Sequence, residues 1–153
     1  MQKSILIGCD NAATNLKKTV SDFLAAQGYE IEDIGCDGPG DLTVYPEIAR
    51  RLCGKMQAEG FSRRGILLCG TGLGMCISAN KFKGVRATVC HDAYSAERSI
   101  LSNDANLLCM GERVVGPELA KKVVGEWISL SFKDGSSTEK VEAIKAIEGE
   151  MMR

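Results

Sequence analysis

Five short segments of the chain have the apolar patterns of β-strands, and the segments between them have the spacing of amphipathic helices. Residues 4–9 and 65–69 are nearly unbroken apolar runs, as expected of parallel strands that helices cover on both faces. Residues 30–34 alternate between polar and apolar, and 85–90 and 106–110 complete the predicted strands. A segment with helical spacing follows each of these strands.

The helical segments carry apolar residues every three or four positions. The first runs from near Leu16 to a stop at Gly28, and the second begins at Pro46, which suits a first helical turn. Further helices are predicted over 75–80, over 93–101, from Pro117 and over about 138–150. Strands that alternate with helices in this way predict the α/β class, with helices on both faces of a parallel sheet.

Length and composition are those of one globular domain. At 153 residues the chain is too short for two ordinary cores, so we predict a single domain over 1–153. Nineteen basic and twenty acidic residues leave a formal net charge of −1, and we therefore expect no nucleic-acid partner and no anionic membrane surface. The longest charge-free stretch, 65–80, contains four glycines, which excludes a membrane span.

Most of the seven cysteines are predicted to be buried apolar residues in a reducing compartment, with Cys69 as the exception. No pair has the C-x-x-C spacing, and a single histidine offers little to a zinc site. A disulfide framework suits small secreted scaffolds, whereas this chain is long enough to bury a core without one. We therefore expect a cytoplasmic protein without a metal.

The candidate site lies where the predicted strands end, because ligands of open α/β sheets bind at the carboxyl ends of the strands. The polar residues that follow the predicted strands are Asp10, Asn11, Thr71, His91, Asp92 and Arg113. Asp92 is also expected to cap the helix over 93–101. These positions, together with the glycine-rich turn 70–74, predict the binding site.

The turn 70–74 predicts a nest of backbone N–H groups ahead of a helix, which favours an anion. It lacks the dinucleotide fingerprint and the Walker lysine. Cys69 beside such a nest can act as a nucleophile or as a base. Nucleophilic hydrolysis usually recruits a histidine, and the lone His91 follows another strand. Proton abstraction next to a carbonyl is favoured, with Thr71 and the turn amides as donors to the enediolate oxygens.

Motifs along nearly the whole chain resemble the type B ribose-5-phosphate isomerase and galactose-6-phosphate isomerase family. They are Gly8-Cys9-Asp10, Tyr45-Pro46, the run 65–75, Ser78-Ala79-Asn80-Lys81, Asn103-Asp104-Ala105-Asn106, Gly111-Glu112-Arg113-Val114-Val115-Gly116 and Val141-Glu142-Ala143-Ile144. The resemblance implies a Rossmann-like three-layer α/β/α sandwich with a five-stranded parallel sheet. It also implies a homodimer, or a dimer of such dimers, with active sites shared across the interface and the helix at about 138–150 packed on the partner. No metal or organic cofactor is implied.

The resemblance implies an aldose–ketose isomerase of a small sugar phosphate that works through a cis-enediolate. Cys69 would be the base and Thr71 would stabilise the enediolate. Asp10 and Asn103 would be the other catalytic residues. The residues expected to line the substrate are Asn11, Tyr45, Gly70, Gly72, Leu73, Gly74, His91, Ser102, Arg113 and Lys140. Arg113 would meet the phosphate, because a guanidinium offers a planar fork to its oxygens.

Departures from the family pattern bear on the substrate. Many members have histidine at the positions of Asn11 and Ser102, and the second histidine opens the furanose ring. Two arginines that bind phosphate align near Ser136 and at Lys140. A serine cannot titrate near neutral pH as an imidazole does. Either His91 opens the ring instead, or the substrate is a four-carbon ketose phosphate such as erythrulose 4-phosphate, which cannot close a furanose through its phosphorylated oxygen.

Two further functions remain open besides an isomerase of the type B ribose-5-phosphate kind. The chain is an alternative candidate for one subunit of a hetero-oligomeric galactose-6-phosphate-type isomerase, whose catalytic residues come from different chains. The other alternative is a non-catalytic sugar-phosphate binder. The set of Asp10, Cys69 and Thr71 argues against a binder, because binding alone needs no base.

Overall fold

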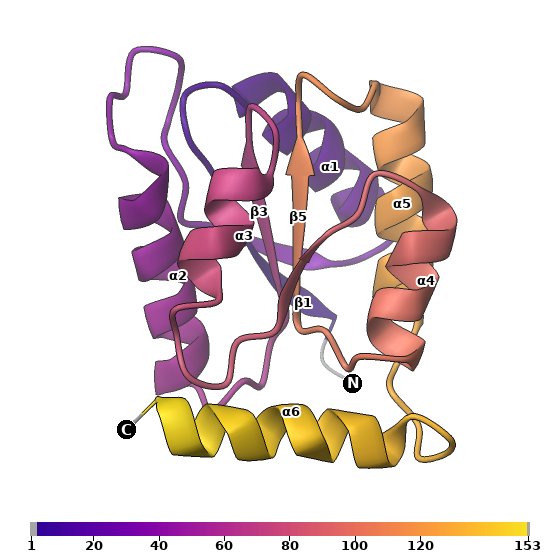
Figure 1. The fold of residues 1–153 in the computed structure, drawn as a ribbon. Helices are drawn as coiled ribbons and strands as arrows, with labels where there is room; N and C mark the ends of the chain where they lie inside the picture. Colours follow the sequence, from indigo (N-terminus) through magenta and orange to yellow (C-terminus); the bar gives the residue numbers. More distant parts are fainter. Residues whose placement is uncertain (1–2, 153) are drawn as a thin grey trace.

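The computed structural model describes residues 3–152, and its strands form one parallel sheet in the order β2-β1-β3-β5-β4 (Figure 1). The strands are β1 (Ser4–Cys9), β2 (Glu30–Asp33), β3 (Gly65–Cys69), β4 (Ala87–Val89) and β5 (Leu107–Gly111). The helices are α1 (Thr14–Ala26), α2 (Tyr45–Ala58), α3 (Leu73–Ala79), α4 (Ala93–Leu101), α5 (Pro117–Ser129) and α6 (Thr138–Met151). The predicted α/β fold with a five-stranded parallel sheet is confirmed.

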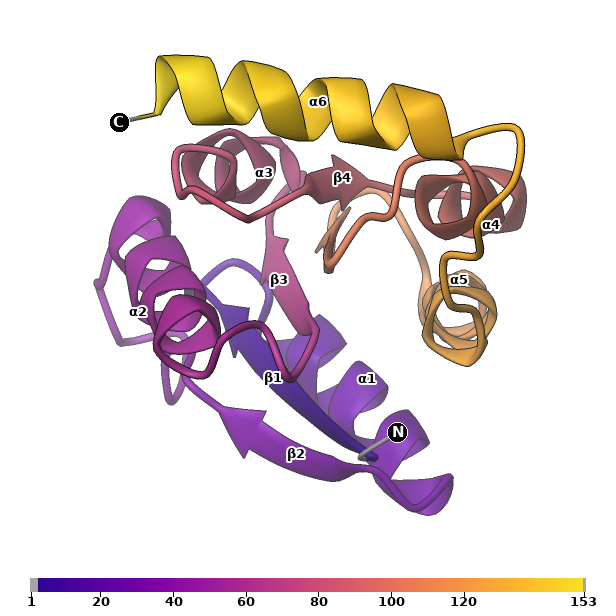
Figure 2. The ribbon, with the colours of Figure 1, turned by 90° about the horizontal axis from the view of Figure 1, so that it is seen from below.

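Helices cover both faces of the sheet, which explains the unbroken apolar runs. Side chains of a strand alternate between faces, so a strand buried on both sides needs apolar residues at every position. In β3, Ile66 and Leu68 belong to the core that α1, α4 and α5 cover. Leu67 and Cys69 belong to the core on the opposite face, under α2 and α3. Figure 2 shows the two helical layers on either side of the strands.

Two predicted elements differ from the structure by two residues at their start, and the other bounds agree to within about one residue. The helix expected over 75–80 begins earlier, at Leu73, because Gly72 adopts a left-handed conformation (φ 81°) as the N-cap of α3 and ends the turn there. The strand expected over 85–90 is shorter, because Val85 N–H donates to Phe82 O in a turn and Arg86 N–H donates to the side chain of Asn106.

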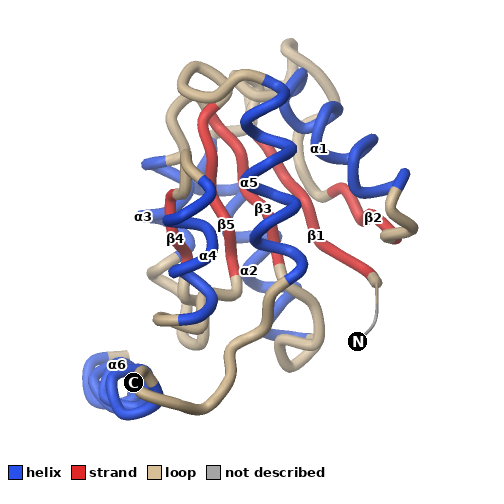
Figure 3. Tube along the Cα trace, turned by 90° about the vertical axis from the view of Figure 1, so that its right-hand side faces the viewer, coloured by secondary structure: helices blue, strands red, loops and turns tan. Residues whose placement is uncertain are grey.

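Helix α6 lies apart from the layers, across the end of the sheet from which the strands start (Figures 1 and 3). Val141 is its buried residue, and the Glu148 carboxylate accepts a hydrogen bond from Gly84 N–H at 2.9 Å. Ile147 and Met151 are 60% and 77% exposed. A helix with apolar residues so exposed leaves a face for another surface to cover.

The cysteines follow the prediction of mostly buried residues. All seven, which lie within the described residues, are unpaired, and all but the half-buried Cys76 are buried. None of the helices in the described part of the chain is long and apolar enough to cross a membrane.

Candidate active site

The carboxyl ends of β1 and β3 lie side by side, and the chain leaves them toward opposite faces of the sheet. After β1 it enters α1, and after β3 it enters α3, and such a point of divergence is where ligands of open α/β sheets bind. Asp10 N–H donates to Leu68 O at 3.2 Å, which sets Asp10 beside the end of β3. This is the edge of the sheet predicted to hold the site.

Cys69 ends β3 with its sulfur against the glycine-rich turn. Gly72 N–H donates to Cys69 Sγ at 3.1 Å, and the side chain is 5% exposed. A backbone N–H directed at sulfur is a contact that holds a thiolate. Leu73 N–H donates to Thr71 Oγ1 at 3.3 Å. The amides of Gly72 and Leu73 therefore donate to the side chains of Cys69 and Thr71 and hold them in place. The sequence predicted instead that these amides would face a ligand.

Tyr45 and Arg113 lie against the same turn, from two other elements. A Cβ on Gly74 would lie 2.6 Å from Tyr45 Cε2, so the ring at the start of α2 needs a glycine beneath it. A Cβ on Gly70 would lie 3.2 Å from Arg113 Nη1, so the guanidinium covers the first residue of the turn. The structure thus brings a phenol and a guanidinium to the edge that holds Cys69.

His91 is fixed at this edge by the backbone of β5. Gly111 N–H donates to His91 Nε2 at 3.0 Å, which leaves the ring proton on Nδ1. Burial lowers the pKa of His91, and the neighbouring Asp92 carboxylate opposes this shift. Asp92 accepts from Ser95 N–H at 2.6 Å and caps α4, as predicted. Both the lowered pKa and the hydrogen bond from Gly111 favour the neutral imidazole, with Nε2 held as an acceptor.

The loop after β1 is tied to the loop after β5 by a residue whose role the sequence analysis missed. Glu112 Oε1 accepts from Leu16 N–H at 2.8 Å, in the first turn of α1. Ala13, the N-cap of α1, has no side chain that can accept a hydrogen bond from the first backbone N–H groups of the helix. An alanine at this position indicates that a residue from elsewhere in the chain accepts one of them, and Glu112 does so. Asp10 Oδ1 accepts from Ala12 N–H at 3.0 Å within the same loop, and Asn11 is exposed beside it.

Three predicted site residues lie at the opposite edge of the sheet within the same chain. Ser102 is the C-cap of α4, the helix that runs back from the carboxyl ends of the strands. Asn103 follows it and is exposed, and Lys140 is exposed on α6. Cys69 and these three residues cannot meet around one ligand in a single chain, because the sheet lies between them.

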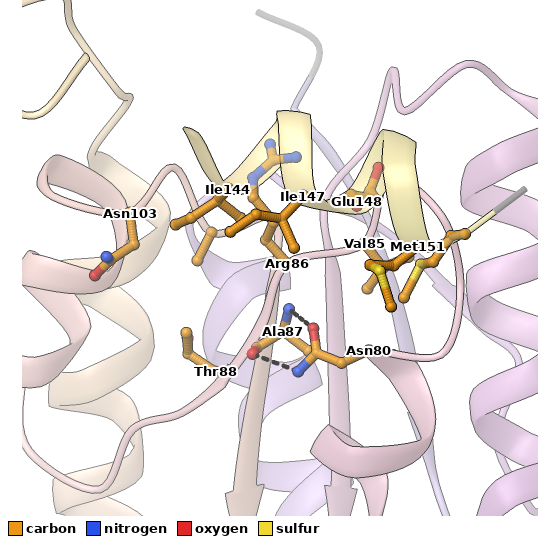
Figure 4. Close-up of a pocket in the computed structure, with 12 residues that line it drawn as sticks. Asn80, Val85, Arg86, Ala87, Thr88, Asn103, Ile144, Ile147, Glu148 and Met151 are labelled. Carbon is orange, nitrogen blue, oxygen red and sulfur yellow. Dashed lines mark hydrogen bonds between the residues drawn. The ribbon is translucent and has the colours of Figure 1, made fainter. Parts of the chain in front are cut away.

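An apolar cavity of about 540 Å³ separates α6 from the start of β4 (Figure 4). Ile144, Ile147 and Met151 of α6 line one side of it, and Val85 and Ala87 line the other. Asn103 lies at its margin in Figure 4. No cluster of three or more metal-ligating side chains occurs between residues 3 and 152.

Comparison with known proteins agrees with this geometry. A family model described as Ribose/Galactose Isomerase matches residues 5–144. The chain belongs to this isomerase family. It is 48% identical to the D-erythrulose-4-phosphate isomerase of Pectobacterium atrosepticum over 92% of each chain. It is 43% identical to ribose-5-phosphate isomerase B of Escherichia coli, over 95% of this chain and 97% of that one.

The fold agrees equally closely with a solved structure of the family. Ribose-5-phosphate isomerase B of Clostridium thermocellum superimposes with a TM-score of 0.90 at 41% identity, over 96% of this chain and 98% of that one. The predicted family, the Rossmann-like fold and the class of activity, a sugar-phosphate isomerase of the type B ribose-5-phosphate kind, are confirmed.

The carboxyl edge of this isomerase carries groups suited to proton transfer on a phosphorylated sugar. A thiolate and a carboxylate can accept protons, and a hydroxyl can donate to a developing oxyanion. A guanidinium can bind phosphate oxygens through its planar fork. Cys69, Asp10, Thr71 and Arg113 supply these four groups from the ends of β1, β3 and β5.

Proposed function

We propose that the chain interconverts an aldose phosphate and a ketose phosphate with Cys69 as the base. The Cys69 thiolate takes a proton from the carbon next to the carbonyl, and the released electron pair forms the enediolate double bond. The carbonyl electrons move onto its oxygen, and a proton passes from the neighbouring hydroxyl to that oxygen. The thiol returns the abstracted proton to the former carbonyl carbon, and the other carbon becomes the new carbonyl. The observation that carries this mechanism is the Gly72 N–H directed at Cys69 Sγ, because it stabilises sulfur in its negative form.

The groups around Cys69 can bind both the reacting end and the phosphate end of the substrate. The Thr71 hydroxyl, which accepts from Leu73 N–H and keeps its own proton to donate, stabilises the enediolate oxygens. Arg113, which covers Gly70, binds the phosphate. Tyr45 and Asp10 hold sugar hydroxyls. No cofactor takes part, because a thiol and hydrogen-bond donors suffice for a proton shift.

A second copy of the chain completes the site. Ser102, Asn103 and Lys140 lie at the edge opposite Cys69, and a twofold dimer supplies this edge of one copy to the carboxyl edge of the other. The exposed apolar side chains of α6 and the apolar cavity beside them support this arrangement, because a partner would bury both. Each 153-residue chain acts as a single domain, with α6 packed on the partner.

A four-carbon ketose phosphate, erythrulose 4-phosphate, is the substrate that the site favours over ribose 5-phosphate. Ser102 stands where ring opening needs an imidazole, and its hydroxyl is bound to the Arg98 guanidinium. His91 is a poor replacement because Gly111 N–H already holds its Nε2. Relatives named D-erythrulose-4-phosphate isomerase, 48% and 49% identical to this chain, support the same choice.

The seven unpaired thiols support a reducing compartment, and we place the enzyme in the cytoplasm on that ground.

The test is exchange of substrate C–H for deuterium, followed by NMR with the purified chain. The panel is ribose 5-phosphate, allose 6-phosphate, galactose 6-phosphate and erythrulose 4-phosphate. We expect exchange to be fastest with erythrulose 4-phosphate and to vanish in Cys69→Ala, with the circular-dichroism spectrum unchanged. Full exchange in Cys69→Ala would refute the mechanism. Binding without exchange would instead identify a non-catalytic binder, and activity that appears only with a different partner chain would identify a hetero-oligomer subunit.

A further inference from the structure

Arg98 and Ser102 form a pair at the C-terminal end of α4 that the proton-transfer mechanism leaves unused. Arg98 Nε donates to Ser102 Oγ at 3.0 Å, and Arg98 Nη2 donates to the same oxygen at 2.6 Å. Arg98 Nη1 contacts Glu97 Oε1 at 3.3 Å. The guanidinium fork is thus directed at one serine hydroxyl.

This contact restricts what the Ser102 hydroxyl can do. A hydroxyl has one proton to donate and two lone pairs to accept with. The two N–H groups of Arg98 occupy both lone pairs, so the hydroxyl is left as a donor only. Ser102 therefore offers a hydrogen bond to an oxygen and has no capacity to accept a proton from one.

The turn that carries Ser102 is held rigid from its other side by Arg86. Arg86 Nε donates to Asp104 O at 2.6 Å, and Arg86 Nη2 donates to Asp104 Oδ2 at 2.9 Å. Asp104 has a left-handed backbone (φ 50°), which costs energy for a residue with a side chain and persists only where contacts enforce it. Two arginines thus fix the residues on either side of the exposed Asn103.

We propose that Arg98 is a positioning and specificity-determining residue, which fixes the Ser102 hydroxyl as a donor to a substrate oxygen and so selects open-chain sugar phosphates. The proposal rests on the proposed function, in which Ser102 and Asn103 reach the site of a second copy. There the hydroxyl donates to the carbonyl oxygen that becomes negative in the enediolate.

The selectivity follows from the proton balance of ring opening. A cyclic sugar opens only when a group takes the proton of the anomeric hydroxyl and a proton reaches the ring oxygen. A hydroxyl restricted to donating performs only the second of these steps. An open-chain ketose phosphate already has its carbonyl, so a donor is sufficient.

A double-mutant cycle at Arg98 and Ser102, with deuterium exchange of erythrulose 4-phosphate as the readout, tests the proposal. We expect Ser102→Ala and Arg98→Leu each to lower kcat about tenfold, the value of one hydrogen bond to a charged oxygen, with KM changed much less. The double variant should be no slower than Ser102→Ala, because Arg98 acts through that hydroxyl. Glu97→Gln, which removes the other charge on Arg98 and leaves Ser102 bound, is the matched control and should keep wild-type exchange.

Independent losses from the two substitutions would overturn the proposal, because Arg98 would then act directly on the substrate. An Arg98→Leu variant with wild-type kcat would overturn it as well. Thermal unfolding midpoints of all the variants should match that of the wild type, which separates positioning from stability. The proposed function is tested separately, by deuterium exchange in the wild type and its loss in Cys69→Ala. If both of these results hold and the double-mutant cycle fails, only the role of Arg98 is refuted. Absence of exchange with every sugar would refute both proposals.

The same geometry makes a second prediction on ribose 5-phosphate. Ser102→His should introduce exchange of this cyclic sugar, and Ser102→His with Arg98→Leu should exchange it faster. A guanidinium beside the new imidazole favours its neutral form and lowers its pKa, so removing Arg98 returns the pKa toward neutrality. Equal or slower exchange in the double variant would contradict the role of Arg98.

Discussion

Contacts at each sulfur decide which cysteines react. Burial raises the pKa of Cys53 to about 12. Cys76, by contrast, is half-buried, and hydrogen bonds, first from Cys109 and then from the Val89 backbone and Asn80, lower its pKa to about 7 against the opposing effect of burial. Both residues are cysteines, so the difference between their pKa values arises from the atoms around each sulfur.

Cys76 should therefore be alkylated by iodoacetamide with a rate that rises through about pH 7, because only the thiolate reacts. Mass spectrometry of digests taken at several pH values measures this directly. Cys76→Ser should keep wild-type exchange, and it is the background in which substrate protection of Cys69 is best measured. A Cys76 that stays unlabelled up to pH 9 would contradict the prediction.

Among the elements, β5 and the turn after β3 are joined so closely that each determines the position of the other. Glu112 N–H donates to Cys69 O, and Arg113 N–H donates to Gly70 O, both at 3.0 Å. A Cβ on Gly111 would overlap Thr71 Cα. The end of β5 therefore sets where Thr71 lies relative to Cys69.

Gly111→Ala should lower the free energy of unfolding by about 2 kcal/mol and reduce exchange further than this loss explains, because the added methyl displaces Thr71. The control is Gly40→Ala in an exposed loop, where a Cβ meets no atom within 4 Å and the expected change is below about 0.5 kcal/mol. Urea titrations of both variants, with kcat measured alongside, make the comparison. Equal stability of the two variants would contradict the close packing of β5 on the turn.

At the scale of the whole molecule, the proposed active site is divided between two edges of the sheet. Cys69 and Thr71 lie at one edge, and Asn103 lies at the other. A mutation in either half therefore inactivates a different part of a shared site.

Mixing two inactive variants, Cys69→Ala and Asn103→Ala, should restore about a quarter of wild-type exchange, because half of the randomly reassociated dimers are mixed and each has one intact site. The variants are mixed after mild dissociation and assayed with erythrulose 4-phosphate. Cys69→Ala mixed with Thr71→Ala is the matched control and should restore nothing, since both changes affect the same half. Equal recovery in the two mixtures would contradict a divided site.

Much of the fold was predictable because local sequence patterns determine where strands and helices begin and end. The apolar runs predict β1 and β3, and Gly28 and Pro46 mark where helices stop and start. Because the strands are parallel, the residues that follow them lie at the same edge of the sheet whatever the order of the strands. The sequence could therefore place Asp10, Thr71 and Arg113 at one edge without the structure.

What the sequence could not provide are the contacts between distant segments. The order of strands places β5 between β3 and β4, and it follows from packing that no local pattern encodes. Glu112 meets Leu16 across 96 positions, and α4 carries Ser102 back to the edge opposite Cys69. The family motifs thus identified an isomerase, while the tertiary structure decided which candidate residues one chain can bring together, because proximity of distant residues exists only after the chain has folded.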